Sequence, residues 1–224
     1  MTKEIENIYH QIQEEIITLK REPGSLLKEA DIVRKFNISR TPVRDILSHL
    51  ECDKLIATPR SNGTYISKID MDYISDIIYV RSQIEISILK EIIDSLTPGD
   101  IVKLKMIVND QEEILHNDHF SRATMVEKFL ELEGLFIKMF YQKAAKESIY
   151  TELAHSQYAY KRYLYLLFSS YLSAMIDTCH QSEELILSLG KHNHKKATEI
   201  CCNQKYIGLE KIWQIKVTHP NYFC

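Results

Sequence analysis

The chain has 224 residues, of which 45% are hydrophobic and 26% charged, with a formal net charge of -3. This balance is ordinary for a globular protein that buries a core, and the length suits one large domain or two modest ones. The charge excludes a protein that is basic all over, but it leaves a local basic face open, because nucleic-acid affinity depends on where the charges lie. Five cysteines without CxxC spacing favour reduced thiols over a disulfide framework.

The N-terminal segment MTKEIENIYHQIQEEI is charged and amphipathic, and it lacks the apolar core of a secretory signal peptide. The sequence has no run of about 18 apolar residues, so it predicts no membrane span. We therefore expect a cytoplasmic protein. Glycine and proline are scarce, at 6 and 5 residues, which favours helices.

Three helices are predicted at the N-terminal end. Apolar residues three and four positions apart indicate amphipathic helices over 4–20, 29–36 and 39–52, separated by REPGS and NIS. Ser39 can cap the third helix, and Pro42 falls in its first turn, where a missing N–H costs nothing. The inward stripe of this third helix comprises Val43, Ile46, Leu47 and Leu50.

A hairpin is predicted directly after these helices. Its short β-prone arms, Ile56–Thr58 and Thr64–Ile66, flank the letters RSNG, and an Asn-Gly pair is a strong turn signal. Three helices followed by such a hairpin are typical of a winged helix-turn-helix. In helix-turn-helix proteins the recognition helix enters the DNA major groove.

The rest of the chain predicts only helices. Asp70 can cap a long helix over 71–95, which TPGD ends. Further helices are expected over 99–116, 121–143, 146–168, 170–189 and 193–216. The predicted fold class is therefore mainly α, with an N-terminal winged helix-turn-helix domain over 1–68 and a C-terminal all-helical bundle over 70–217.

The outward side of the third helix carries residue types that read DNA. Arg40 and Arg44 lie one turn apart near its N-terminal end, and each guanidinium can fork to guanine O6 and N7. Residues 34–60 include six basic and three acidic side chains, which makes this region locally basic. The alternative is that Arg40 and Arg44 are an ordinary solvated pair. The tight turn, Pro42 and the predicted wing disfavour this alternative, because all three stand where a winged helix-turn-helix has them. The candidate DNA contacts are Arg34, Ser39, Arg40, Thr41, Arg44, Arg60, Asn62 and Gly63.

The stretch PGSLLKEADIVRKFNISRTPVRDILSHLECDKLIATPRSNGTYI, residues 23–66, resembles the signature of the GntR family of bacterial transcriptional regulators. The letters YVRSQIEISILKEI, with Arg81 and Glu85 at the R..LE positions, make the longer domain similar to the FCD (FadR C-terminal domain) subgroup. The resemblance implies a homodimer formed through the helical domain and two recognition helices that read double-stranded operator DNA. It also implies a small-molecule effector inside the bundle.

Many members of this subgroup hold a divalent metal with one Asp and three His. In the matching letters ELEGLFIKMF, Glu133 takes the carboxylate place but Ile137 takes a histidine place, while Ser182 and Gln204 take the other two. Isoleucine cannot bind a metal, and serine and glutamine are poor ligands for zinc-type ions. His180 is rotated by roughly 200° from Ser182 on a helix, so it should face away. We therefore expect no metal and no other cofactor.

An effector pocket without the metal would be lined by apolar and aromatic groups with a few polar ones. Arginine forks match carboxylates and phosphates, so Arg81 and Arg162 are candidates to pair an anionic effector. The 13 tyrosines, several of them between 150 and 171, offer rings and hydroxyls for a ligand but serve equally well as core or dimer surface. The candidate effector-binding residues are Arg81, Glu133, Tyr158, Arg162, Ser182 and Gln204.

Two functions remain open. The first is a sequence-specific transcriptional regulator, a repressor in most such proteins, controlled by a small organic effector in the helical domain. The second is a dimeric DNA-binding regulator whose helical domain has lost metal and effector binding and serves only for dimerisation. An enzyme is not expected, because the sequence has no glycine-rich phosphate loop, no HExxH and no Ser/His/Asp spacing suited to a triad.

Overall fold

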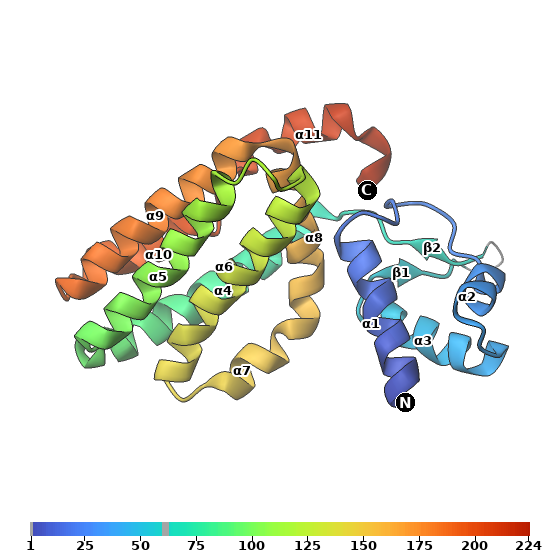
Figure 1. Cartoon of the computed structure of the whole chain (residues 1–224), viewed down its shortest axis with the longest axis horizontal. Helices are drawn as coiled ribbons and strands as arrows, with labels where there is room; N and C mark the ends of the chain where they lie inside the picture. The colour runs from blue at the N-terminus through green and yellow to red at the C-terminus, as the bar shows by residue number, and fades with distance from the viewer. Residues whose placement is uncertain (1, 60–62) are drawn as a thin grey trace. The chain divides into compact units, whose positions relative to one another are not determined.

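The computed structural model describes residues 2–59 and 63–224, without the side chains of residues 154–156. The chain divides into two compact units, and most of both is helical (Figure 1), so the predicted mainly α class is confirmed. Unit 1 comprises Met1–Ile74, His155–Leu166 and Gln214–Cys224, and unit 2 comprises Ser75–Ala154 and Leu167–Trp213. The elements are α1 (Lys3–Ile17), α2 (Glu29–Phe36), α3 (Arg40–Cys52), β1 (Ile56–Ala57), β2 (Tyr65–Ile66), α4 (Met71–Ile92), α5 (Pro98–Leu115), α6 (Arg122–Lys143), α7 (Glu147–Glu152), α8 (Ala154–Ser170), α9 (Leu172–Gly190), α10 (His194–Gln204) and α11 (Ile212–Thr218).

Unit 1 is built on an apolar core shared by its first three helices. α1 contributes Ile12 and Ile16, and α2 contributes Ile32, all of them buried. α1 ends at Ile17, earlier than predicted, because Leu19 adopts a left-handed conformation with φ 57°. The predicted inward stripe of α3 is buried in full, and each such side chain stabilises the fold by about 1.5–3 kcal/mol. Its members are Val43, Ile46, Leu47 and Leu50.

The hairpin of unit 1 is shorter than the predicted arms, with two residues in each strand. β1 and β2 are antiparallel, with Ile56 opposite Ile66. The segment before α2 extends this ribbon, because the Leu27 N–H donates to the Thr64 carbonyl at 2.8 Å and the Ile66 N–H donates to the Ser25 carbonyl at 2.9 Å. The hairpin therefore has its outer edge covered by the chain that leads into α2.

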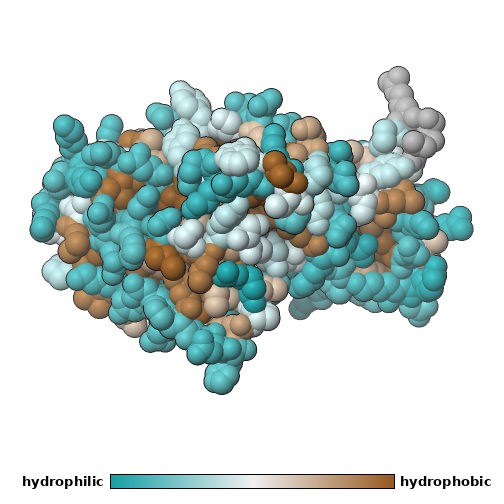
Figure 2. All heavy atoms as spheres, turned by 90° about the horizontal axis from the view of Figure 1, so that it is seen from above, coloured by the Kyte–Doolittle hydropathy of each residue, from teal (hydrophilic) through white to brown (hydrophobic). Residues whose placement is uncertain are grey.

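Unit 2 is a bundle in which α9 packs against α5 and α10, and α5 packs against α6. Aromatic side chains fill its centre, and Phe129 meets Phe168 edge-on with ring centroids 5.5 Å apart. On the face drawn in Figure 2, hydrophilic residues dominate, and several groups of hydrophobic residues are exposed between them. Within residues 2–59 and 63–224, we find no helix with the length and apolar character needed to cross a membrane.

Two predicted helices are each interrupted. The segment expected as one helix over 146–168 turns at Leu153 between α7 and α8, and nothing in the local sequence marks this turn. The segment expected over 193–216 breaks after α10, because Gly208 has φ 76° and ends the helical path. A Cβ at Gly208 would lie 2.6 Å from the side chain of Leu167, so glycine is also the residue that fits the space.

Candidate nucleic-acid interface and polar cluster

The outer face of α3 is polar and exposed. Arg40, Thr41 and Arg44 are all exposed there, opposite the buried stripe. Within the described part of the chain, neither arginine side chain forms an ion pair or a hydrogen bond. Arg34 on α2 is also exposed, but it pairs with Asp31 at 3.0 Å, so part of its charge is already neutralised. Two unpaired guanidinium groups one turn apart form a small cationic surface.

The N-terminal end of α3 adds backbone donors to this surface. Asn37 closes α2 in a left-handed conformation with φ 52°, which makes the tight turn that leads into α3. Ser39 occupies the predicted N-cap position with an extended backbone, but its side chain makes no capping hydrogen bond. The first turn of α3 contains no acidic residue. Free N–H groups at a helix N-terminus favour an anion such as a phosphate.

The wing of the hairpin is described only at its edges. Arg60 and Asn62, two of the predicted DNA contacts, lie outside the described residues. Gly63 is exposed and has φ 89°, a conformation that favours glycine. A Cβ at this position would also approach the Leu26 side chain to 3.1 Å. The predicted glycine is therefore required by the backbone of the turn, whatever else it contacts.

A buried ion cluster lies in unit 2. Glu85 is 2% exposed, accepts a hydrogen bond from Arg81 Nη2 at 3.0 Å, and forms an ion pair with Lys205 Nζ at 2.8 Å. Burial alone would raise the pKa of Glu85, but the two cations lower it below its usual value. Lys205 is not predicted from the sequence, because it lies 120 residues after Glu85 and only the fold brings the two side chains together. The cluster carries two positive charges and one negative charge.

Three of the four positions of the family's metal ligands make side-chain hydrogen bonds. Gln204 Nε2 donates to Ser182 Oγ at 3.0 Å, and Gln111 Nε2 donates to a Glu133 oxygen at 3.3 Å. Ile137 is buried at the histidine place. Over residues 2–59 and 63–224, no group of three His, Cys, Asp or Glu side chains is arranged to hold a metal ion.

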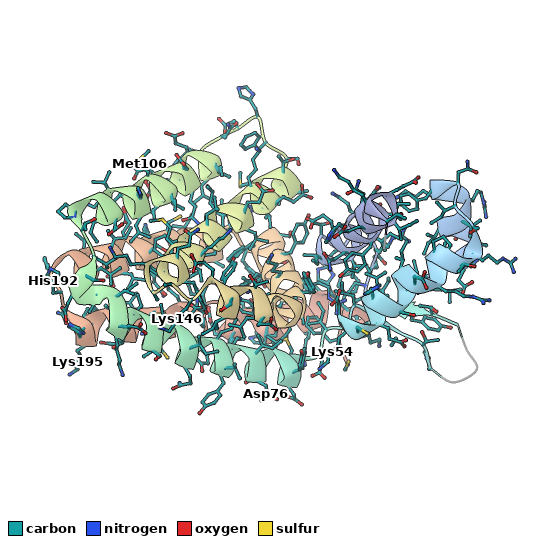
Figure 3. The ribbon with its side chains drawn as sticks, turned by 90° about the horizontal axis from the view of Figure 1, so that it is seen from below. Lys54, Asp76, Met106, Lys146, His192 and Lys195 are labelled. Atoms are coloured by element: carbon teal, nitrogen blue, oxygen red, sulfur yellow. The ribbon has the colours of Figure 1, made fainter. Side chains whose placement is uncertain are left out.

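Two buried glutamines in this region each keep an acceptor oxygen without a hydrogen-bond partner. They are Gln111 and Gln204, whose Oε1 atoms meet no donor among the described side chains. His180 is exposed on α9, as expected for a residue turned away from Ser182. Figure 3 shows His192 at one end of its bundle. A hydrogen-bond donor is the kind of group that would satisfy the two glutamine oxygens.

The candidate effector residues fall into both units. Arg81, Glu133, Ser182 and Gln204 belong to unit 2, whereas Tyr158 and Arg162 belong to the α8 segment of unit 1. Tyr158 packs against the core of the first three helices, and burial raises the pKa of its hydroxyl. Arg162 is buried and donates from Nη2 to the Lys68 carbonyl at 2.9 Å. The sequence alone could not separate these two groups, because α8 contributes to both units.

Sequence comparison with known proteins identifies relatives for part of the chain. Residues 4–66 match the sequence model of the gntR family of bacterial regulatory proteins. The HTH-type transcriptional repressor RspR of Escherichia coli K12 is 26% identical over 140 residues, which are 62% of this chain and 58% of RspR. The Uxu operon regulator of Haemophilus influenzae is 31% identical over 98 residues, 39% of this chain and 37% of that protein. The chain thus spans less than two thirds of these curated relatives.

Solved structures extend the likeness to nearly the whole chain. E. coli McbR/YncC has a TM-score of 0.73 at 13% identity, over 96% of this chain and 99% of that one. A GntR structure from Rhodococcus sp. RHA1 has a TM-score of 0.67 at 17% identity, over 96% and 98%. At these identities the likeness shows the fold alone.

Proposed function

The chain belongs to the GntR family of bacterial regulatory proteins through residues 4–66, and on this premise we propose that it is a sequence-specific DNA-binding transcriptional regulator. The observation that carries the proposal is the outer face of α3, with Arg40, Thr41 and Arg44 exposed above a fully buried stripe. RspR is a repressor by name, and repression is the mode we propose for this chain.

The proposed mode of binding places α3 in the major groove. Arg40 and Arg44 would fork to guanine O6 and N7, each pair contributing about 1–3 kcal/mol of discrimination against another base. Ser39 and Thr41, with the free N–H groups beside them, would hold a phosphate and set the register. Arg34 and the wing residues Arg60, Asn62 and Gly63 would contact the flanking backbone or the minor groove. A homodimer would present two such helices to a two-fold symmetric operator.

Selection of binding sequences from a random pool of DNA duplexes tests this proposal. We expect one two-fold symmetric motif to be enriched, with half-sites about one helical turn apart. Fluorescence anisotropy should then show an affinity for that motif that falls steeply between about 50 and 200 mM salt, because phosphate contacts release counterions. Sedimentation of the complex should give two chains per duplex. Failure to enrich any sequence would contradict the proposal.

We propose further that the polar cluster of unit 2 binds a small anionic effector. Arg81 and Lys205 place two cations around Glu85 in this cluster, and cations favour an anionic ligand nearby. Gln111 and Gln204 offer acceptor oxygens that have no partner among the described residues, so a ligand with donors would satisfy them. Effector binding would shift the population of dimer conformations and weaken the fit of the two α3 helices to the operator.

A dimer without an effector is the second candidate. The Gln204–Ser182 and Gln111–Glu133 hydrogen bonds favour it, because they satisfy among themselves groups that a ligand would otherwise need. A thermal-shift screen with small carboxylates and acyl thioesters separates the two. A ligand that binds the folded state raises the midpoint of unfolding with concentration. If no compound does so while operator binding persists, the effector-free reading stands.

A further inference from the structure

Unit 1 contains a cavity of about 350 Å³ that neither proposed site uses. It is lined by the segment that leads from the hairpin into α4 and by two residues of α8. Its walls include Lys54, Lys68, Ile69, Tyr73, Ala159 and Arg162. All of these residues belong to unit 1. The cavity is large enough for a small organic molecule.

Arg162 lines this cavity with donors that are not satisfied. Its side chain is buried, at 3% exposure, and Nη2 alone is used, on the Lys68 carbonyl. The Nε and Nη1 groups have no hydrogen-bond partner among the described residues. Burial lowers the pKa of Arg162 to about 10, so the guanidinium stays charged at neutral pH. A buried cation with idle donors is costly unless an anion or acceptor meets them.

The surrounding residues add charges of both signs. Lys54 and Lys68 add two cations, and Lys54 Nζ lies 3.9 Å above the ring of Tyr73. Figure 3 labels Lys54, which is exposed at the surface of its unit. Two acidic groups share the wall. Asp70 is occupied in capping α4, since its Oδ1 accepts from the N–H groups of Asp72 and Tyr73 at 3.0 and 3.1 Å. Cys224 also lines the cavity, and its negative charge acts to raise the pKa of Arg162, but it makes no hydrogen bond to Nε or Nη1.

The remaining wall is apolar. Ile69 and Ile74 are buried, and Ala159 leaves room beside them on α8. A carboxylate or phosphate would fork to the Nε and Nη1 groups of Arg162, while a short apolar body would cover the isoleucines and the Tyr73 ring. We propose that this cavity is a binding site for a small organic anion, with the Arg162 guanidinium as its anchor. The residues of this site belong to unit 1 and those of the polar cluster to unit 2, and the site does not depend on the proposed DNA binding.

Isothermal titration with three probes tests the site on the full chain. Benzoate carries a carboxylate and an apolar ring, benzamide has the same shape without charge, and inorganic phosphate has the charge without the ring. We expect benzoate to bind and benzamide not to bind. Binding of phosphate at the same site would identify the charge alone as sufficient. If neither benzoate nor phosphate binds the wild-type chain, the proposal is overturned.

Three variants locate the binding. Arg162→Gln removes the anchor, and Ala159→Leu fills the cavity while keeping the guanidinium. Both should weaken benzoate binding by about tenfold or more. Arg122→Gln removes the same charge from an exposed position on α6 and should leave binding unchanged. Circular dichroism checks that each variant is folded, and the cavity-filling variant carries the test if Arg162→Gln does not fold. Unchanged affinity in a folded Arg162→Gln or Ala159→Leu variant would place any binding elsewhere and refute the assignment.

Discussion

Arg40 and Arg44 of α3 are exposed and unpaired in the described structure, while the helix beneath them is held by a buried stripe. A truncation of Arg44 should therefore affect recognition without affecting stability. We expect Arg44→Ala to reduce specific operator affinity by at least the 1–3 kcal/mol of one bidentate base contact, about 5- to 150-fold. Anisotropy titration against the selected operator measures this loss, and thermal unfolding should give an unchanged midpoint.

The control for this prediction is Arg122→Ala, which removes the same charge from an exposed position on α6. It should change operator affinity only slightly. Equal affinity of wild-type and Arg44→Ala chains for the operator would show that α3 is not the reading helix. Equal losses in both variants would point to net charge rather than to a specific contact.

Glu85 is the most consequential charge of unit 2, because it is buried between two cations. Removal of one partner from such a cluster leaves the others uncompensated, and we expect Glu85→Gln to lower the free energy of unfolding by about 3–5 kcal/mol. Urea denaturation of both chains measures the difference. Glu91→Gln is the matched control, since Glu91 pairs with Lys146 at 2.6 Å but is exposed, and it should cost less than about 1 kcal/mol.

The same cluster predicts a pH dependence of stability. The pKa of Glu85 is lower in the folded chain than its ordinary value of 4.5, so the unfolded chain binds more protons when the pH falls below that value. The stabilisation is therefore complete above about pH 4.5 and is lost as the pH falls through the lowered folded value. Urea denaturation at several acidic pH values should show a smaller acid loss for Glu85→Gln than for the wild type. Identical pH profiles would contradict this role.

At the scale of helices and strands, periodicity predicts most elements and misses their interruptions. The apolar spacing of α2 and α3 predicts both helices and the buried face of α3, because the same residues fix the helix and its packing. The break after α10 has a different cause. Gly208 is visible in the sequence, but a helix could pass through a glycine. Its left-handed conformation and the closeness of Leu167 of α8, which leaves no space for a Cβ, are not contained in any local pattern.

Replacement of Gly208 tests that cause. Gly208→Ala forces a non-glycine residue into a conformation with φ 76° and puts a Cβ against Leu167, so it should destabilise the chain by about 1–3 kcal/mol. Gly190→Ala is the matched control, because Gly190 is helical and a Cβ there meets nothing within 4 Å. It should be neutral or stabilising by up to about 1 kcal/mol. Thermal unfolding measures both, and equal midpoints for the two variants would argue against strain at Gly208.

At the scale of the whole molecule, the division into units is the feature that sequence order hides. The expected domains were continuous, 1–68 and 70–217, whereas the compact units exchange segments. Residues 155–166 and 214–224 pack with the first unit although they lie late in the chain. For this reason the sequence alone could not assign Tyr158 and Arg162 to a unit. The family pattern, in contrast, places Glu133, Ser182 and Gln204 at positions of one common site.

The metal content of the intact protein tests the prediction that the family's metal site is lost in this chain. Ile137 has no atom that can bind a metal, and the other two histidine places are held by Gln204 and Ser182, which hydrogen-bond to each other at 3.0 Å. We expect elemental analysis of protein purified without chelator to find no stoichiometric divalent metal, and dialysis against EDTA to leave the unfolding midpoint unchanged. A bound structural metal would contribute to the free energy of folding, so its removal would lower that midpoint. A tightly held zinc or nickel ion that chelation removes with loss of stability would mean that Glu133 and unpredicted partners form a site despite the missing imidazoles.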